Sequence, residues 1–182
     1  MPTTLDPTLA LAIRLFLALL FGFAAWSKLR NLSVFAEDLR GYRILSDGMV
    51  RMAAPGIALS EGALLLGLLL MPASPLPALG AVLLLLGYGG AIAINLLRGR
   101  RDLSCGCGGL SADQPIGWPL VWRNLVVAAA GSVLLLETAP RALIWVDFVS
   151  AVLASLFLAA LYAAADLLIR VQARLMRGVA HD

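Results

Sequence analysis

Charged residues are scarce in this sequence. Asp, Glu, Lys and Arg make up 14% of the chain, whereas 61% of its residues are hydrophobic. A water-soluble domain carries about 25% charged residues, and a chain this poor in charge would expose large apolar patches to water. The shortage of charge excludes an ordinary soluble domain and predicts an all-α, polytopic membrane helix bundle, because lipid offers no partner to unpaired backbone groups.

Cysteine and histidine are also nearly absent. The two cysteines, Cys105 and Cys107, are one residue apart, whereas a secreted fold held by disulfides distributes its cysteines along the chain. The one histidine, His181, is next to last, so we expect no metal or haem site. The surroundings we expect are the lipid bilayer and protein partners, with no nucleic acid.

Five apolar runs are long enough to cross a membrane, which takes about 20 helical residues. A proline-rich connection, residues 72–77, separates the second run from the third, and the charged connection before the second run predicts an amphipathic interfacial helix near residues 31–45. We expect one four-helix domain over residues 1–136, and an extra transmembrane helix with a basic tail over 137–182. The runs are residues 8–26, 53–71, 76–97, 119–136 and a segment within 143–169.

The basic residues are distributed unequally between the two predicted sides of the membrane. With five crossings, twelve Lys and Arg residues fall on one side and Arg141 alone on the other, while Arg14 lies within the first run. Basic loops stay in the cytoplasm, so we expect an inner (plasma) membrane protein with its N-terminus outside and its cysteine loop, residues 98–118, and C-terminus inside. The twelve are Lys28, Arg30, Arg40, Arg43, Arg51, Arg98, Arg100, Arg101, Arg123, Arg170, Arg174 and Arg177.

The cysteine motif is the first candidate for chemistry. A Cys-x-Cys pair can just be bridged, and strain in such a small ring makes the disulfide oxidising and labile. Three arginines precede the motif (Arg98, Arg100 and Arg101), and nearby cations lower the pKa of a thiol. The residues alone leave three interpretations open: a redox-active dithiol at Cys105 and Cys107, inert interfacial cysteines, or ligands to a metal or cluster shared between molecules.

Ionisable residues within the apolar runs form the second candidate. A charge within a membrane span is costly, which makes it a functional hypothesis by default. Arg14 and Glu61 lie at roughly matching depths in the first two runs, so we expect them to form a buried pair, either as a structural salt bridge or as a polar contact to a quinone or a substrate. Arg123 and Asn124, near the cysteine loop, are either residues of the same cofactor site or interfacial anchors.

The sequence resembles the methylamine utilisation protein MauE family, within the wider DoxX-like membrane proteins. The resemblance covers about residues 10–136 and rests on Arg14, Glu61, the stretch 98–109 with its two cysteines, and Trp122-Arg123-Asn124 downstream. Where this chain has Gly108, family members often have an aromatic residue. The resemblance implies a four-helix bundle that acts beside a thioredoxin-like protein in maturing a disulfide-rich periplasmic enzyme subunit, such as the small subunit of methylamine dehydrogenase.

Together these observations favour a membrane thiol–disulfide redox protein. It would pass electrons between a thioredoxin-like partner and either a quinone or a second dithiol, and so support maturation of a disulfide-rich exported client. Two cysteines do not provide a second internal pair, so the second redox partner has to be a cofactor or another protein. The rival hypotheses are a non-catalytic membrane scaffold or assembly factor and, third, a small-solute transporter that uses Arg14 and Glu61.

Overall fold

The computed structural model describes residues 4–101, 103–104 and 115–179, with side chains described up to residue 172. This part of the chain is helical, with isolated bridges but no β-strand. Five of its helices are long and apolar enough to cross a membrane, which confirms the predicted polytopic bundle. The elements are α1 (Pro7–Arg30), α2 (Leu32–Gly41), α3 (Asp47–Leu70), α4 (Leu76–Leu97), α5 (Trp118–Ser132) with the 3-10 turn η1 (Val133–Leu135), and α6 (Trp145–Val179).

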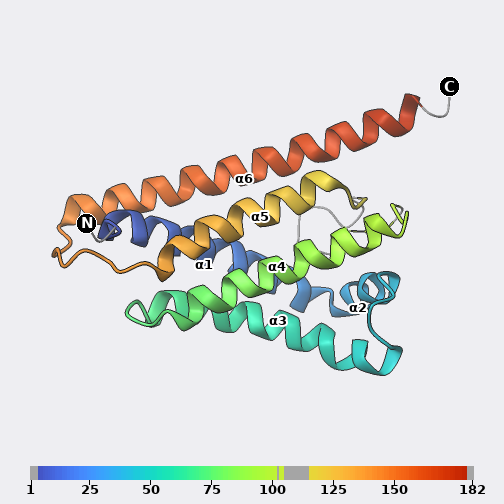
Figure 1. Ribbon diagram of the computed structural model, residues 1–182, viewed down its shortest axis with the longest axis horizontal. Coiled ribbons are helices and arrows are strands. Elements are labelled where there is room, and N and C mark those ends of the chain that lie inside the picture. The colour runs from blue at the N-terminus through green and yellow to red at the C-terminus, as the bar shows by residue number, and fades with distance from the viewer. Residues whose placement is uncertain (1–3, 102, 105–114, 180–182) are drawn as a thin grey trace.

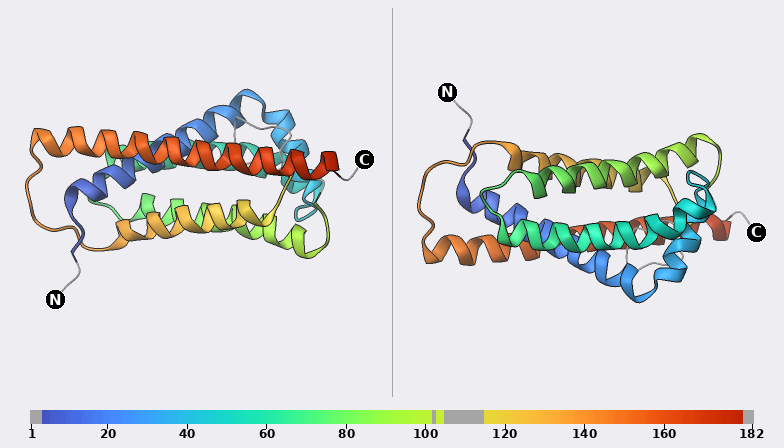
Figure 2. Two further views of the ribbon diagram at one scale, coloured as in Figure 1. Left: turned by 90° about the horizontal axis from the view of Figure 1, so that it is seen from above. Right: turned by 90° about the horizontal axis from the view of Figure 1, so that it is seen from below.

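The long helices lie side by side along one axis (Figure 1). The most extensive contacts are those of α4 with α5, of α1 with α3 and of α1 with α6. Helix α6 runs along the whole length of the bundle on one side (Figure 2), and it ends at the opposite end from the start of α1. The end of the bundle that holds α2 and the residues next to the cysteines is called the cysteine end below, and the opposite end is called the amino-terminal end.

Close packing between helices depends on small residues. At Gly67 a Cβ atom would lie 2.9 Å from the Pro77 side chain, so only glycine lets the end of α3 approach the start of α4 this closely. Small residues serve the same purpose in membrane helices generally, because lipid provides no hydrophobic drive for helices to associate. The short connection of residues 71–75 and these contacts make α3 and α4 an antiparallel hairpin.

The segment before α1 is attached to the segment before α6. The Leu5 amide donates to the Glu137 carbonyl at 2.8 Å, and the Ala139 amide donates to the Leu5 carbonyl at 2.9 Å. Arg141 extends this attachment, because its guanidinium lies 2.9 Å from an Asp147 carboxylate oxygen and donates to the Thr8 hydroxyl at 2.9 Å. These bonds join the start of α1 to the start of α6 at the amino-terminal end.

Helix α2 forms where a short amphipathic helix was predicted. It begins directly after α1, separated from it by Asn31, and turns Phe35 into the bundle while Val34 and Glu37 stay exposed. A Cβ atom at its last residue, Gly41, would lie 3.5 Å from the Leu103 side chain, which belongs to the segment that leads into the cysteines. Helix α2 thus lies across the cysteine end, and its position at the membrane surface stays a prediction.

Candidate functional site

The segment that carries the predicted redox pair is held at both of its ends. Cys105 and Cys107 themselves lie outside the described residues. Immediately before them Ser104 forms an antiparallel bridge with Pro115, and the Ile116 amide donates to the Leu103 carbonyl at 2.9 Å. The chain before the cysteines and the chain after them are therefore joined to each other at the cysteine end.

Arg100 fixes the chain just upstream of the cysteines. Its guanidinium donates to the Gly41 carbonyl at 2.8 Å, to the Tyr42 carbonyl at 3.3 Å and to the Asn95 side-chain oxygen at 3.1 Å. Carbonyls at a helix C-terminus lack partners within the helix and carry partial negative charge, so a cation suits this position. Among the three arginines that precede the motif, Arg100 is thus bound to the end of α2, whereas Arg98 and Arg101 are exposed.

A buried ion pair lies between α1 and α3. The Lys28 ammonium is 2.7 Å from a Glu61 carboxylate oxygen, and the two side chains are 2% and 0% exposed. The Tyr88 hydroxyl, from α4, donates to the same oxygen at 2.6 Å. The other Glu61 oxygen has no hydrogen-bond partner within the described part of the chain.

Aromatic rings surround the Lys28 ammonium. Its nitrogen lies 5.2 Å from the centre of the Phe35 ring and 5.3 Å from the centre of the Tyr88 ring. Both distances fall within cation–π range. Lys28, Glu61 and Tyr88 are called the buried cluster below, and they join three helices by charge, hydrogen bonding and ring contacts.

The predicted pairing of Arg14 with Glu61 is wrong. Arg14 instead donates to the Met71 carbonyl, at 3.5 Å, beyond the last residue of α3. Met71 is ten residues past Glu61, which places Glu61 about 15 Å deeper along the helix axis. The prediction assumed that α1 and α3 start and end at equal depths, but α2 and the following turn let α3 start farther out at the cysteine end.

A second group of charged residues, Arg123, Asp166 and Arg170, joins α5 to α6 and is called the outer cluster below. Asp166 accepts a salt bridge from Arg123 and a second from Arg170, the latter at 2.8 Å, and the Arg123 guanidinium lies 4.9 Å from the centre of the Tyr162 ring. The side chains of Arg123 and Asp166 are 9% and 10% exposed. Arg123 is therefore a link to α6.

Asn124 has a different environment from its neighbour Arg123. It is buried, and its amide donates to the Leu120 carbonyl of its own helix at 2.8 Å. Its Cβ lies 3.5 Å from the position a Gly89 Cβ would take, so it packs where α4 and α5 approach each other. The four residues predicted to contact a cofactor, Arg14, Glu61, Arg123 and Asn124, thus have four different sets of neighbours.

Sequence reasoning missed two members of the buried cluster, Lys28 and Tyr88. Lys28 was counted only as a basic residue outside the first apolar run. A signal was present, because Lys28 continues the helical spacing of Phe21, Ala24 and Ala25, which are all buried on one face of α1. A lysine on a buried stripe needs an acidic partner, and Glu61 is the acidic residue within the next run.

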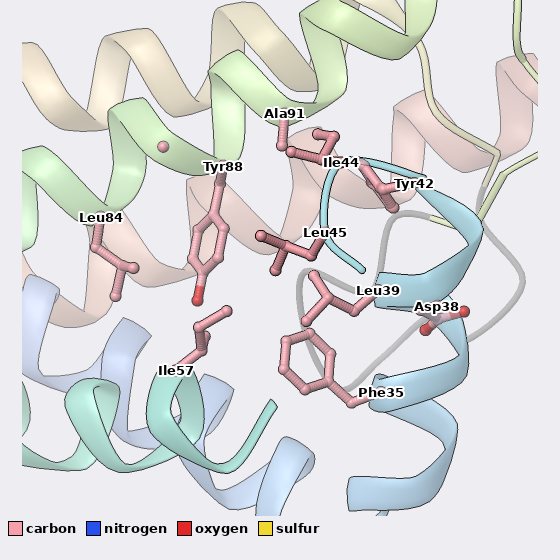
Figure 3. Close-up of a pocket in the computed structure, with 11 residues that line it drawn as sticks. Phe35, Asp38, Leu39, Tyr42, Ile44, Leu45, Ile57, Leu84, Tyr88 and Ala91 are labelled. Atoms are coloured by element: carbon pink, nitrogen blue, oxygen red, sulfur yellow. The ribbon is translucent and has the colours of Figure 1, made fainter. Parts of the chain in front are cut away.

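A cavity of about 240 Å³ adjoins the buried cluster between α2, α3 and α4. Figure 3 shows that Phe35 and Leu39 come from α2, that Leu84 and Tyr88 come from α4, and that the Tyr88 hydroxyl points toward Ile57 of α3. The lining surface is almost wholly apolar. A largely apolar cavity with a few polar side chains in its wall, here Asp38, Tyr42 and Tyr88, is the usual form of a small-molecule site.

These features define a class of protein: a five-span helical membrane bundle with a Cys-Gly-Cys segment attached at one end and a buried ion pair beside a cavity. Comparison with known families is consistent with this class. The family model described as methylamine utilisation protein MauE matches residues 6–137. The chain belongs to the MauE family.

Several relatives show how far the similarity extends. The chain is 42% identical over 125 residues to a methylamine utilization protein MauE of Paracoccus denitrificans, covering 69% of this chain and 67% of the relative. The protein of the same name from Methylophilus methylotrophus is 32% identical over 168 residues, covering 90% and 87%. A match of that extent includes much of α6, beyond the family model. No solved structure matches the chain.

Proposed function

We propose that this protein is an integral membrane thiol–disulfide redox protein of methylamine utilisation, with Cys105 and Cys107 as the exchanging pair. It passes electrons between a thioredoxin-like partner and a quinone or second dithiol, and so supports maturation of a disulfide-rich exported client. The observation that carries the proposal is the attachment of the cysteine segment: Leu103 and Ser104 pair with Pro115 and Ile116, and Arg100 anchors the approach to α2. Family membership and the names of the relatives support the methylamine context.

The chemistry is a pair of exchange steps. A thiolate of the partner attacks the Cys105–Cys107 disulfide, and a mixed disulfide forms while one cysteine leaves as a thiolate. The partner's second thiolate then attacks the mixed disulfide, which oxidises the partner and leaves both cysteines reduced. Two electrons have moved, and the dithiol passes them, with two protons, to a quinone or to a second disulfide. Each step is reversible, so the same pair also carries electrons in the other direction.

Replacing the cysteines separates this function from a scaffold. Cys105 and Cys107 are replaced one at a time by Ser. The variant that lacks the resolving cysteine should trap a covalent complex with the thioredoxin-like partner, visible on non-reducing gels. The double variant should stop formation of client disulfides while the bundle stays folded. Arg98→Met is the control, because the Arg98 side chain is exposed. Full client maturation with both cysteines absent would instead identify the protein as a non-catalytic assembly factor.

Sidedness is a separate part of the proposal. The excess of basic residues favours a cytoplasmic location for the cysteine end. A dithiol there still serves an exported client if the protein transfers electrons across the membrane. In intact cells, a membrane-impermeant maleimide added from outside should leave Cys105 and Cys107 unmodified, and permeabilised cells should show modification. Labelling of Cys105 in intact cells would place the cysteine end outside.

A further inference from the structure

The cavity between α2, α3 and α4 has a shape and a lining that restrict its ligand. Three aromatic residues, Phe35, Tyr42 and Tyr88, and one acidic residue, Asp38, line the cavity, and its other lining residues are aliphatic or glycine. Two other lining residues, Ile44 and Gly87, are exposed on the outside of the bundle. In a membrane protein that outside surface contacts lipid, so a lipid-soluble ligand can enter from the bilayer.

The polar group at the inner side of the cavity is a phenol with a defined hydrogen-bond direction. The Tyr88 hydroxyl donates its proton to Glu61 at 2.6 Å, and Glu61 is in turn neutralised by Lys28 at 2.7 Å. A hydroxyl that donates in this way keeps oxygen lone pairs that accept. The ligand atom that matches Tyr88 is therefore an O–H donor on an apolar ring, and a hydrocarbon chain offers no such donor.

We infer that this cavity binds the ring of a lipid-soluble hydroquinone, with one ring hydroxyl donating to Tyr88 and the hydrocarbon tail leaving past Gly87 into lipid. The choice of a quinone-type carrier rests on the proposed redox function, which needs a second two-electron partner. The structure adds the location and a preference: the reduced ring binds more tightly than the oxidised ring, because a quinone carbonyl accepts and does not donate.

Direct binding tests the inference without any redox turnover. The full-length protein in nanodiscs is equilibrated with decylubiquinol or decylubiquinone, and the bound ligand is counted against empty nanodiscs. We expect saturable binding with one site per chain and an affinity for the quinol several-fold higher than for the quinone. Binding no greater than that of empty nanodiscs, or a preference for the quinone, overturns the inference.

Two matched glycine variants locate the site. Gly87 lines the cavity, and Gly90 lies one turn farther along α4 outside the lining; both are exposed, and a Cβ at either position would meet nothing within 4 Å. Gly87→Leu should reduce quinol affinity at least tenfold by occupying the cavity, whereas Gly90→Leu should leave it within twofold. Equal affinities for these two variants would show that the quinol binds elsewhere.

Tyr88→Phe tests the hydrogen bond. Loss of one neutral hydrogen bond corresponds to about a three- to tenfold change in affinity. We expect the variant to bind the quinone as the wild type does and to lose the preference for the quinol, with a thermal unfolding measurement to confirm that it is folded. A quinol preference that survives in Tyr88→Phe would exclude Tyr88 as the acceptor.

The cysteine double variant keeps this inference separate from the proposed function. The cavity-lining residues do not include the cysteines, so the Cys105→Ser, Cys107→Ser protein should bind the quinol normally. Normal quinol binding together with full client maturation in that variant would contradict the proposed redox function and support the quinol site. Absent quinol binding in the wild type, together with failed maturation in the double variant, would contradict the quinol site and support the proposed redox function.

Discussion

The buried cluster and the outer cluster both place charges at membrane depth, but they differ in composition and in what surrounds them. Lys28 and Glu61 form a neutral pair that joins α1 to α3 and is closed off from the surface. The outer cluster sets two arginines against one Asp166 and is partly exposed. The first lies within the part of the chain that matches the family model, and the second reaches into α6, beyond that part.

The helices that the two clusters join also differ in how much of their surface is buried. Half of the membrane-spanning stretch of α1 is buried, against 11% of that of α6. Helix α1 packs against neighbours on several sides, so its buried Lys28 ammonium needs an acidic partner within the bundle. Helix α6 exposes most of its surface to lipid, and the ionic contacts to Arg123 supplement a limited packing interface.

The largest effect is expected from breaking the buried cluster. Glu61→Leu leaves the Lys28 ammonium without its partner in an apolar interior, which typically costs about 3–5 kcal/mol. Thermal and denaturant unfolding in detergent should show this loss. Lys28→Met combined with Glu61→Leu should recover most of the stability, because neither charge then remains buried. Arg14→Met is the control, with an expected change below about 1 kcal/mol, since Arg14 makes a single long hydrogen bond. An equally large loss for Arg14→Met would contradict this assignment.

A smaller effect is expected from the outer cluster. Asp166→Asn removes the negative charge between Arg123 and Arg170, and we expect a loss of about 2 kcal/mol because the cluster is partly exposed. The loss should concentrate in α6. Limited proteolysis should cut the 136–144 connection faster in the variant than in the wild type, while the rest of the bundle resists. Unchanged cleavage would mean that packing against α1 is sufficient to hold α6.

Arg100 offers a test that sharpens the contrast between stability and function. Arg100→Met removes three hydrogen bonds at the surface of the bundle, and we expect a loss of about 1–2 kcal/mol. Its main effect should be on the cysteine segment, since that segment begins a few residues later. The rate of thiol modification at Cys105 and Cys107 should change in Arg100→Met and stay unchanged in Arg98→Met, whose exposed side chain provides the matched control.

The smallest effect is a pH dependence at the amino-terminal end. The Thr8 amide, which donates to Asp6 at 2.8 Å, lowers the pKa of that carboxyl below its ordinary value, and Arg141 lowers it further. A carboxyl with a lowered pKa in the folded state stabilises above its ordinary pKa, and the stabilisation is lost as pH falls through the lower value. The ordinary pKa of an aspartate carboxyl is about 4. Between about pH 5 and pH 3, the unfolding temperature of the wild type should therefore fall more than that of Asp6→Asn. Parallel curves would exclude this contribution.

Much of the architecture could be predicted from local sequence. The run at residues 76–97 coincides with α4, and the runs at 8–26 and 53–71 lie on α1 and α3, which begin before them. The run at 119–136 divides into α5 and the 3-10 turn η1, and α6 continues past the fifth segment. Apolar length and backbone satisfaction in lipid leave few alternatives to these helices. The short helix after α1 was also predictable, since its apolar residues recur at helical spacing. The pairing of charges was not predictable in the same way, because it depends on the depth at which each helix begins.

The sequence by itself determined that this is a five-span helical bundle, where its two cysteines lie in the chain, and to which family it belongs. Only the tertiary structure decided that Glu61 meets Lys28 and not Arg14, that Tyr88 joins them, and that Arg123 holds α6. The physical reason is that hydrophobicity is a property of each segment alone. The partner of a buried charge is set by the stagger and rotation of whole helices, which in turn depend on α2 and on contacts between residues distant in the chain.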